Sequence, residues 1–335
     1  MLSTYAMTLA ALFAFVLTGM SGLAVVPFLH RLHYGQTIKE IGPTWHKSKQ
    51  GTPTMGGLCF IMGSTLGLGV GWLYIGMAEP DLMGDQQAFN VMLALSASWA
   101  FSLVGFLDDY IKVVKKRNLG LKAMQKIVLQ VAITVLFLYG LHLNGMLTTA
   151  VVLPVFGFVD LGVLFYPIAF LGIIFMVNAV NLTDGVDGLA SSVTFVVMLA
   201  YIVTAVVLDY FHLAVFAAAV AGGCAGFLLW NFHPAKVFMG DTGSMYLGGA
   251  VTAIAFCMAR PELLLFFGFI YICEAGSVVI QVTYFKLTHG KRIFKMTPIH
   301  HSFEMDGWSE EKICMAFSMA AAAAALLGLT FLRLS

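Results

Sequence analysis

The sequence predicts an all-α polytopic membrane protein with about ten transmembrane helices. Hydrophobic residues make up 60% of the 335 residues and charged residues only 10%, whereas about a quarter of the residues in a soluble domain are charged. Apolar runs long enough to cross a bilayer recur along the whole chain, and the positive residues gather in alternate loops. Composition, run length and charge pattern therefore favour the same class.

The apolar runs define the expected helices. A bilayer core about 30 Å thick requires about 20 mainly apolar residues per helix. The segments that meet this requirement are 5–29, 55–77, 89–107, 127–145, 161–180, 189–208, 211–230, 243–258, 263–287 and 313–332. The eighth is short and rich in glycine, and the ninth is long and ends in Lys286, which indicates tilt, a break or an extension into water. With no repeat or soluble domain visible, we expect a single integral membrane domain over 1–335.

The charge pattern predicts how these segments are oriented. If they alternate in direction, one face carries the loops 30–54, 107–126, 181–188, 231–242 and 286–312. All 18 Lys and Arg residues except Arg260 and Arg333 fall in these loops or at the adjoining helix ends. Because positive residues favour the cytoplasmic side, we expect these loops in the cytoplasm and both termini outside. The residues suited to chemistry lie on the same side, so we expect the active site on the cytoplasmic face.

The most informative stretch is 178–188, where an apolar segment ends in two amides and two carboxylates. Asn178 and Asn181 are three residues apart and therefore neighbours on a helix face. Asp184 and Asp187 have the same spacing, but Gly185 lies between them, so the helical register cannot be extended across this pair. Helix capping is one explanation for such residues. A single cap needs only one of them, so the four together indicate a binding site.

Adjacent carboxylates close the third segment at Asp108 and Asp109, with Lys112 one turn further on. Such a pair is unfavourable without a cation, and Mg²⁺ takes oxygen ligands and often bridges to a substrate phosphate. An ordinary interfacial cluster neutralised by the nearby lysines is the alternative. Lys126, at the start of the fourth segment, suits either a membrane anchor or a phosphate contact.

Two further polar inserts contain possible substrate contacts. Lys49 precedes a Gly-Thr-Pro-Thr turn that ends at Thr54, and its ammonium with the neighbouring hydroxyls could hold a phosphate or nucleotide. A basic loop lying against anionic lipid is the alternative. In the insert 231–244, Phe238 could stack on a base, and Asp241 could cap the short eighth helix.

Near the C-terminus, His300 and His301 are adjacent, which is not the i, i+4 spacing of helical metal ligands. Phosphate binding or structural hydrogen bonds suit these histidines better. Glu274 lies inside the ninth segment, where packing against a polar partner and a catalytic role are both open. Carboxylates, lysines and histidines at one membrane boundary fit phosphoryl transfer between a soluble substrate and a lipid phosphate. A lipid or solute transporter is a different class, but it would place ionisable groups near the bilayer midplane.

Five motifs carry a resemblance that covers essentially the whole chain. They are Gly-Thr-Pro-Thr-Met-Gly-Gly at 51–57, Gly-Phe-Leu-Asp-Asp at 105–109, the stretch 178–188, Phe-Met-Gly-Asp-Thr-Gly-Ser at 238–244 and Pro-Ile-His-His-Ser-Phe-Glu at 298–304. In this order they resemble the polyprenyl-phosphate N-acetylhexosamine-1-phosphate transferase superfamily, and within it the phospho-N-acetylmuramoyl-pentapeptide transferase (MraY) family. One departure is Ser302, which stands where the family usually has a third histidine.

The resemblance implies a homodimer in the bacterial inner membrane that needs Mg²⁺. The implied reaction moves phospho-MurNAc-pentapeptide from UDP-MurNAc-pentapeptide to undecaprenyl phosphate, giving lipid I and UMP for peptidoglycan biosynthesis. Single displacement and a phospho-enzyme both remain open. A related enzyme that uses another UDP-N-acetylhexosamine is the alternative. Uridine-containing nucleoside inhibitors are expected to bind, and nucleic acid is not expected as a partner.

The resemblance also implies roles for individual residues. Asp241 is the implied magnesium ligand, with Asp108, Asp109 and Asp184 as further candidates. Asp108 is the implied base for the lipid phosphate, supported by Asp109. The other implied contacts are Asn178, Asn181, Asp184 and Asp187 at the nucleotide and metal site, Lys49, Asn231 and Phe238 at the uridine, His300 and His301 at the phosphate or sugar, and Thr54, Lys126 and Gly240 elsewhere in the substrate site.

Overall fold

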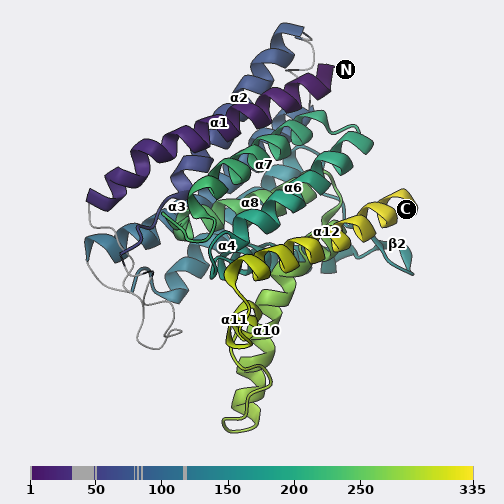
Figure 1. Cartoon of the computed structure of the whole chain (residues 1–335). Coiled ribbons are helices and arrows are strands. Elements are labelled where there is room, and N and C mark those ends of the chain that lie inside the picture. The colour runs from purple at the N-terminus through teal and green to yellow at the C-terminus, as the bar shows by residue number, and fades with distance from the viewer. Residues whose placement is uncertain are drawn as a thin grey trace.

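The computed structural model describes residues 2–31, 49, 51–78, 80, 83, 86–115 and 119–334. Most of the predicted loop 30–54 and the positions 116–118 lie outside the described residues. The remaining chain is helical except for one small hairpin and the connecting loops (Figure 1).

Twelve α-helices are present in the described part of the chain. They are α1 (Leu2–Arg31), α2 (Gly57–Ala78), α3 (Gln86–Val114), α4 (Ala123–Leu143), α5 (Phe165–Thr183), α6 (Leu189–Val207), α7 (Phe211–Asn231), α8 (Gly240–Cys257), α9 (Leu264–Phe267), α10 (Phe269–Leu287), α11 (Ile299–Met305) and α12 (Glu310–Leu334). Among the described residues, nine helices are long and apolar enough to cross a membrane. The chain is a polytopic membrane protein, as the sequence predicts.

The predicted eighth segment is α8, which is not one of those nine. It has 18 residues and begins with Gly240 and Asp241. Every residue from Thr242 to Cys257 is buried, because the longer helices surround it. Glycine allows the close packing: a Cβ on Gly57 would collide with the Gly243 backbone, and a Cβ on Gly105 would collide with the Asp241 carbonyl. This packing holds the start of α8 against α2 and α3.

The predicted ninth segment, 263–287, contains a break. A short 3₁₀ helix (Pro261–Leu263) and α9 precede Gly268, and α10 begins directly after it. A side chain at Gly268 would contact the Leu264 carbonyl and Met176, so glycine is the residue that fits. Beyond the break, α10 projects from the helix bundle together with α11 (Figure 1). Of the outcomes that the sequence allowed for this segment, a break is therefore observed.

A β-hairpin between α4 and α5 departs from the all-α prediction. Strands β1 (Ala150–Leu153) and β2 (Gly157–Asp160) pair antiparallel. The turn between them uses the left-handed conformation at Val155 (φ 73°) and Gly157 (φ 70°). Each strand has only four residues, shows no alternation of apolar and polar residues and lies between two long apolar segments, so the sequence gives no strand signal there.

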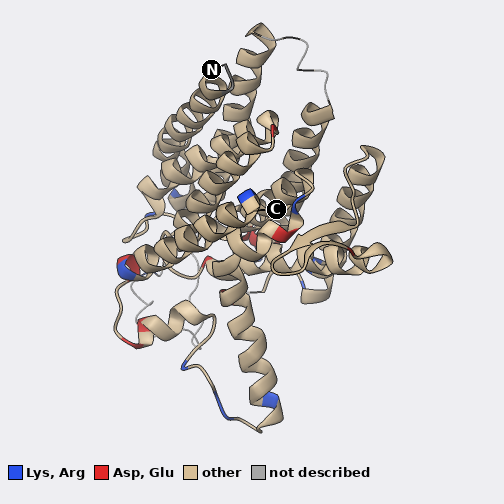
Figure 2. Cartoon of the chain, turned by 90° about the vertical axis from the view of Figure 1, so that its right-hand side faces the viewer, with Lys and Arg blue, Asp and Glu red and all other residues tan. Residues whose placement is uncertain are grey.

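Helix ends from distant parts of the chain meet on one face of the bundle, which we call the site face. The C-terminal ends of α3, α5 and α7 lie there with the N-terminal ends of α4, α6, α8 and α12. This is the alternation of helix directions that the sequence predicts, in which the predicted eighth segment, α8, also counts as a crossing. Figure 2 shows that charged residues are sparse along the helices and concentrated at helix ends and in loops. The packing of the helices therefore brings acidic and basic residues from separate loops together on the site face.

Candidate active site

A polar cavity of about 130 Å³ lies on the site face. Its wall comes from Lys49, Thr54, the end of α3, the end of α5 with the loop that leads to α6, and the connection from α7 to α8. The lining residues are Lys49, Thr54, Asp109, Asn181, Asp184, Gly185, Val186, Asp187, Asn231, Phe238, Gly240 and Asp241.

Three carboxylates from two helices meet at one side of this cavity, and we call them the aspartate triad. Asp108, Asp109 and Asp241 place carboxylate oxygens within 4.8 Å of one another. Lys112 Nζ lies 2.6 Å from Asp108 Oδ2, 3.6 Å from Asp109 Oδ1 and 3.1 Å from Asp241 Oδ2. Lys126 Nζ lies 3.4 Å from Asp108 Oδ2 and 2.6 Å from Asp241 Oδ2. The two lysines therefore hold three negative charges together.

Backbone N–H groups fix the orientation of the triad. The N–H and hydroxyl of Thr242 donate to Asp109 Oδ2 at 2.9 and 2.8 Å, and the Leu121 N–H donates to Asp108 Oδ1 at 2.8 Å. Gly240 has φ of 71°, and a Cβ there would lie 2.5 Å from Asp109 Oδ2 and 2.6 Å from Thr54 Oγ1. Only glycine fits this position, both for its conformation and for its space.

Asn181 connects the α5 helix to the triad. Its Nδ2 donates to Asp241 Oδ1 at 2.9 Å and to Ser244 Oγ at 2.8 Å. Asp184 follows at the end of α5 and lines the same cavity. Burial raises the pKa of the Asp184 carboxyl to about 8, and the charges of Asp241 and Asp109 add to this effect. A fourth carboxylate thus faces a site whose two lysines already interact with three.

This donor set fits a divalent cation. Carboxylate oxygens are the ligands that hard cations such as Mg²⁺ and Ca²⁺ prefer. Asp109, Asp184 and Asp241 line the cavity, so a cation there would have carboxylate oxygens within reach on one side and space for a ligand on the other. It would also remove the repulsion that raises the Asp184 pKa. These residues could hold a metal ion.

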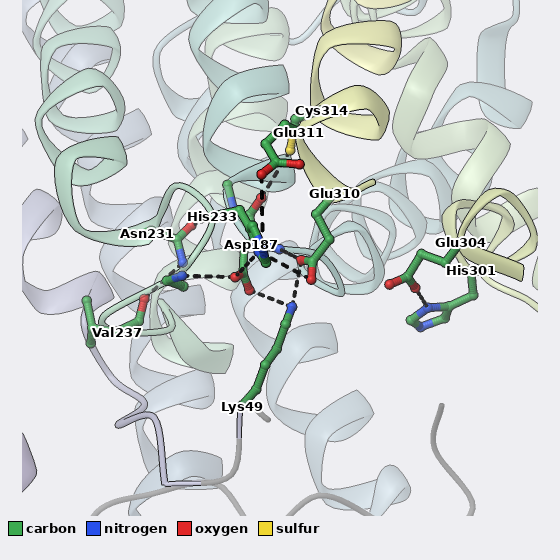
Figure 3. Close-up of polar contacts among 12 residues, drawn as sticks. Lys49, Asp187, Asn231, His233, Val237, His301, Glu304, Glu310, Glu311 and Cys314 are labelled. Atoms are coloured by element: carbon green, nitrogen blue, oxygen red, sulfur yellow. Dashed lines mark hydrogen bonds and ion pairs between the residues drawn. The ribbon is translucent and has the colours of Figure 1, made fainter. Parts of the chain in front are cut away.

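A second charged group also borders the cavity, and we call it the Lys49 cluster (Figure 3). Lys49 Nζ lies 2.7 Å from Asp187 Oδ1 and 2.6 Å from Glu310 Oε2. His233 Nδ1 lies 3.0 Å from Asp187 Oδ2 and 3.4 Å from Glu310 Oε1. The cluster joins the loop after α5, the segment after α7 and the first residue of α12.

The acidic groups of the Lys49 cluster already have ion-pair and hydrogen-bond partners within the chain. Asp187 Oδ2 also accepts the Ala235 N–H at 2.9 Å, and the Asp187 N–H donates to Glu310 Oε2 at 2.9 Å. Burial acts to lower the pKa of Lys49, but its hydrogen bonds and charge interactions with Asp187 and Glu310 outweigh this and raise it. The Lys49 ammonium therefore occupies the place that a metal ion would take between these carboxylates.

Asn231 and Phe238 shape the cavity beside this cluster. Asn231 Oδ1 accepts the Gly188 N–H at 3.2 Å, and its Nδ2 donates to the Val237 carbonyl at 2.9 Å. The Phe238 N–H donates to the Pro53 carbonyl at 2.8 Å, and its carbonyl accepts the Gly56 N–H at 2.9 Å. The 53–56 segment and the chain before α8 are thus hydrogen-bonded side by side.

The two histidines of α11 each pair with a glutamate. His300 Nδ1 lies 3.0 Å from Glu274 Oε2, and both side chains are fully buried. His301 Nδ1 lies 2.5 Å from Glu304 Oε2, a pair that is also visible in Figure 3. At the next position the Ser302 hydroxyl donates to the Met296 carbonyl at 2.6 Å and accepts the Met296 N–H at 3.2 Å. The residue in place of a third histidine therefore holds the turn before α11.

The structure brings most of the predicted site residues together. Ten of them line the cavity: Lys49, Thr54, Asp109, Asn181, Asp184, Asp187, Asn231, Phe238, Gly240 and Asp241. Asp108 and Lys126 lie outside the lining but contact Asp241 or its lysine partners. Asn178 does not line it, because its amide exchanges hydrogen bonds of 2.8 and 3.3 Å with Gln130. His300 and His301 do not line it either.

Sequence reasoning missed two members of the Lys49 cluster, His233 and Glu310. His233 stands in the same polar insert as Asn231, and Glu310 begins the last membrane helix on the side with the other charges. A rule that pairs every acid at a membrane helix end with a cation would have selected Glu310. The sequence alone gives no sign that its partners are residues 123 and 261 positions away.

Comparison with known proteins agrees with this arrangement. The glycosyl transferase family 4 model matches residues 91–259. The phospho-N-acetylmuramoyl-pentapeptide-transferase signature 1 matches residues 49–61, which include Lys49 and Thr54.

Full-length relatives carry the same name. The phospho-N-acetylmuramoyl-pentapeptide-transferase of Heliobacterium modesticaldum is 46% identical over 94% of this chain and 95% of its own length. Those of Caldicellulosiruptor bescii and Listeria monocytogenes are each 43% identical, covering 97% and 94% of this chain and 97% and 95% of their own lengths. The motifs that build the cavity and these matches lead to one conclusion: the chain belongs to the phospho-N-acetylmuramoyl-pentapeptide-transferase family.

Proposed function

We propose that this chain transfers phospho-MurNAc-pentapeptide from its UDP carrier to undecaprenyl phosphate, releasing UMP and forming lipid I for peptidoglycan and cell-wall biogenesis. Family membership supports the reaction. The observation that carries it is a group of four carboxylates and two lysines in and beside the cavity wall, at the ends of membrane helices: Asp109, Asp184 and Asp241 line the cavity, and Asp108, Lys112 and Lys126 lie next to them. A water-soluble nucleotide sugar and a membrane-bound lipid phosphate can both reach such a place.

Mg²⁺ is the proposed cofactor, with Asp241 as its main ligand and Asp109 and Asp184 beside it. When bound, the ion supplies positive charge that neutralises the substrate diphosphate. In the transfer, an oxygen of the lipid phosphate forms a bond to the sugar-bearing phosphorus, and the bond from that phosphorus to UMP breaks. Asp108 is the proposed base that readies the lipid phosphate, and its carboxylate Oδ2 lies 2.6 Å from the Lys112 ammonium.

The uridine end of the substrate is proposed to lie toward the Lys49 cluster. Lys49, Asn231 and Phe238 line this side of the cavity and can offer a cation, an amide and an aromatic ring. Asp187 orients Lys49 through its 2.7 Å ion pair. Uridine-containing nucleoside inhibitors should bind in the same place. We further propose that the chain acts as a homodimer, forms one integral membrane domain and presents this site to the cytoplasm.

A comparison of donors tests the proposal. Purified protein in lipid with undecaprenyl phosphate and Mg²⁺ should release UMP from UDP-MurNAc-pentapeptide and produce the corresponding lipid-linked sugar. UDP-GlcNAc, which lacks the lactyl-peptide arm, should give no turnover above background. Turnover of UDP-GlcNAc alone would contradict the proposed substrate and favour the related UDP-N-acetylhexosamine enzyme.

A further inference from the structure

The Glu274–His300 pair has no part in the reaction as described so far. Glu274 lies in the first third of α10, just beyond the break at Gly268, and His300 is the second residue of α11. Both side chains have an exposed fraction of 0%. A carboxylate and an imidazole so completely buried in a membrane protein are expensive to keep, and such residues commonly serve function. The pair is held by one contact, 3.0 Å between Nδ1 and Oε2.

The other ring nitrogen of His300 points at the cavity wall. Nε2 is buried and has no hydrogen-bond partner among the described residues. It lies directly against Gly185: a Cβ added to Gly185 would collide with Nε2 and come within 2.7 Å of Cε1. Gly185 itself lines the cavity, between Asp184 and Val186. Nε2 therefore lies against a residue of the cavity wall that has no side chain.

Glu274 determines which atom of His300 faces that wall. A carboxylate accepts a hydrogen bond from Nδ1–H, so this nitrogen is the donor whether the ring is neutral or protonated. Nε2 is then the atom left for another partner, in the arrangement by which a second residue commonly fixes the tautomer and direction of a functional histidine. The neighbouring His301 ring packs edge-on at 4.1 Å and is held by its own glutamate, Glu304. The ring of His300 has little room to turn.

We infer that Glu274 is a positioning residue for the transfer reaction: it holds the imidazolium form of His300, in which both ring nitrogens donate, so that Nε2–H can donate to a phosphate oxygen of the nucleotide sugar across the Gly185 wall. The inference rests on the proposed function, in which the nucleotide sugar occupies the cavity that Gly185 lines. Glu274 acts through His300 and does not touch the substrate. Glycine at 185 can rotate its peptide to open the path to Nε2, since it has the widest conformational range of any residue.

Glu274→Gln tests the inference, because the amide keeps the size and can still accept from Nδ1–H, or turn and impose the wrong tautomer. We expect kcat to fall about 10–100-fold, the range found when the partner of a functional histidine is removed. KM for UDP-MurNAc-pentapeptide and the affinity for UMP should change by less than about 2-fold on this argument, since the uridine contacts are elsewhere. The matched control is Glu262→Gln, a buried glutamate paired with Arg260 on the opposite face, which should keep wild-type kcat.

A double-mutant cycle separates positioning from a merely structural role. If Glu274 acts through His300, Glu274→Gln in the His300→Gln background should lower kcat by less than about 2-fold, because coupled residues are not additive. An equal loss in both backgrounds, or wild-type kcat in folded Glu274→Gln, would overturn the inference. So would a loss of activity that is accounted for by a smaller folded fraction in thermal unfolding.

Gly185→Ala approaches the same atom from the cavity and serves if Glu274→Gln does not accumulate. The added methyl group would displace Nε2, so kcat should fall while UMP still binds; unchanged kcat would contradict the inference. Wild-type protein in the same lipid is assayed beside every variant. Failure of the wild type to transfer phospho-MurNAc-pentapeptide would refute the proposed function, whereas the inference is judged from the ratio of each variant to an active wild type.

Discussion

The aspartate triad and the Lys49 cluster border the same cavity but differ in how their charges are balanced. In the Lys49 cluster, Lys49 and His233 lie between the carboxylates of Asp187 and Glu310, and backbone N–H groups complete the hydrogen bonds. At the triad, two lysines face three carboxylates, and Asp184 lines the same cavity as a fourth acidic residue. Because the Lys49 ammonium lies between the carboxylates of its own cluster, the aspartate triad is the better candidate for a metal site.

We expect the largest loss of activity from a substitution in the aspartate triad. Asp241→Asn removes the carboxylate that contacts Lys112, Lys126 and Asn181, and with it the main proposed metal ligand. UMP release should fall by at least about 10²–10³-fold, as when one group that stabilises transition-state charge is removed. Asp209→Asn, on the opposite face, is the control. Near wild-type turnover by folded Asp241→Asn would remove Asp241 from the chemistry.

The Lys49 cluster should affect substrate binding more than chemistry. Lys49→Met removes the ammonium and leaves Asp187 and Glu310 facing each other. We expect the affinity for UMP to fall about 10–100-fold, corresponding to the roughly 1.5–3 kcal/mol of a hydrogen bond to a charged group. Isothermal titration with UMP measures this. The Mg²⁺ concentration for half-maximal activity should stay the same; a shift in it would mean that the two groups are not separate.

Asp184 should make the stability of the folded protein, and its stabilisation by Mg²⁺, depend on pH. Its pKa in the folded protein is about 8, above its ordinary value of 3.8, so the folded state binds a proton that the unfolded state releases. Without metal, this contribution to stability is full below about pH 4 and is lost as the pH rises toward 8. A divalent cation must displace that proton, so its stabilising effect should grow between pH 6 and 8. Thermal unfolding with and without Mg²⁺ at several pH values tests this.

Asp184→Asn supplies the control for the pH experiment. The amide does not titrate, so the growth of Mg²⁺ stabilisation between pH 6 and 8 should become much smaller. An unchanged pH dependence in this variant would assign the effect to another group.

The smallest effect is expected outside both groups, at Ser302. Ser302→Ala removes the two hydrogen bonds to the Met296 backbone and leaves that turn less stable. The free energy of unfolding should fall by about 1 kcal/mol, with turnover within about 2-fold of wild type because neither bordering group contains Ser302. Loss of turnover beyond the loss of folded protein would show that the position of the usual third histidine is catalytic in this chain.

Sequence patterns were sufficient for the helices and for the face on which the polar residues collect. Length and hydropathy locate α1 to α7, α10 and α12 because lipid imposes a strong requirement on each of them. The same rule is weak for α8, whose surroundings are other helices and which therefore tolerates Asp241 and four glycines. The same rule does not detect the β1–β2 hairpin, because the hairpin is defined by hydrogen bonds between its strands and not by hydropathy.

The spacing of the polar residues in 178–188 does not predict which partner each side chain contacts. Asn181 and Asp184 face the aspartate triad, Asn178 pairs with Gln130, and Asp187 joins the Lys49 cluster. Helix α5 ends at Thr183, so the regular three-residue spacing no longer describes where side chains point beyond it. Which partner each side chain meets depends on loops that are distant in sequence, and a single sequence does not contain that information.

The Lys49 cluster also has a consequence for how the protein is made. Asp187 emerges from the ribosome long before Glu310, whose carboxylate receives both the Asp187 N–H and the Lys49 ammonium. Until α12 is made, the Asp187 N–H and the Lys49 ammonium are without the Glu310 carboxylate that accepts from both. A chain truncated before α12 would therefore lack the carboxylate that contacts two residues of the cavity wall, Lys49 and Asp187.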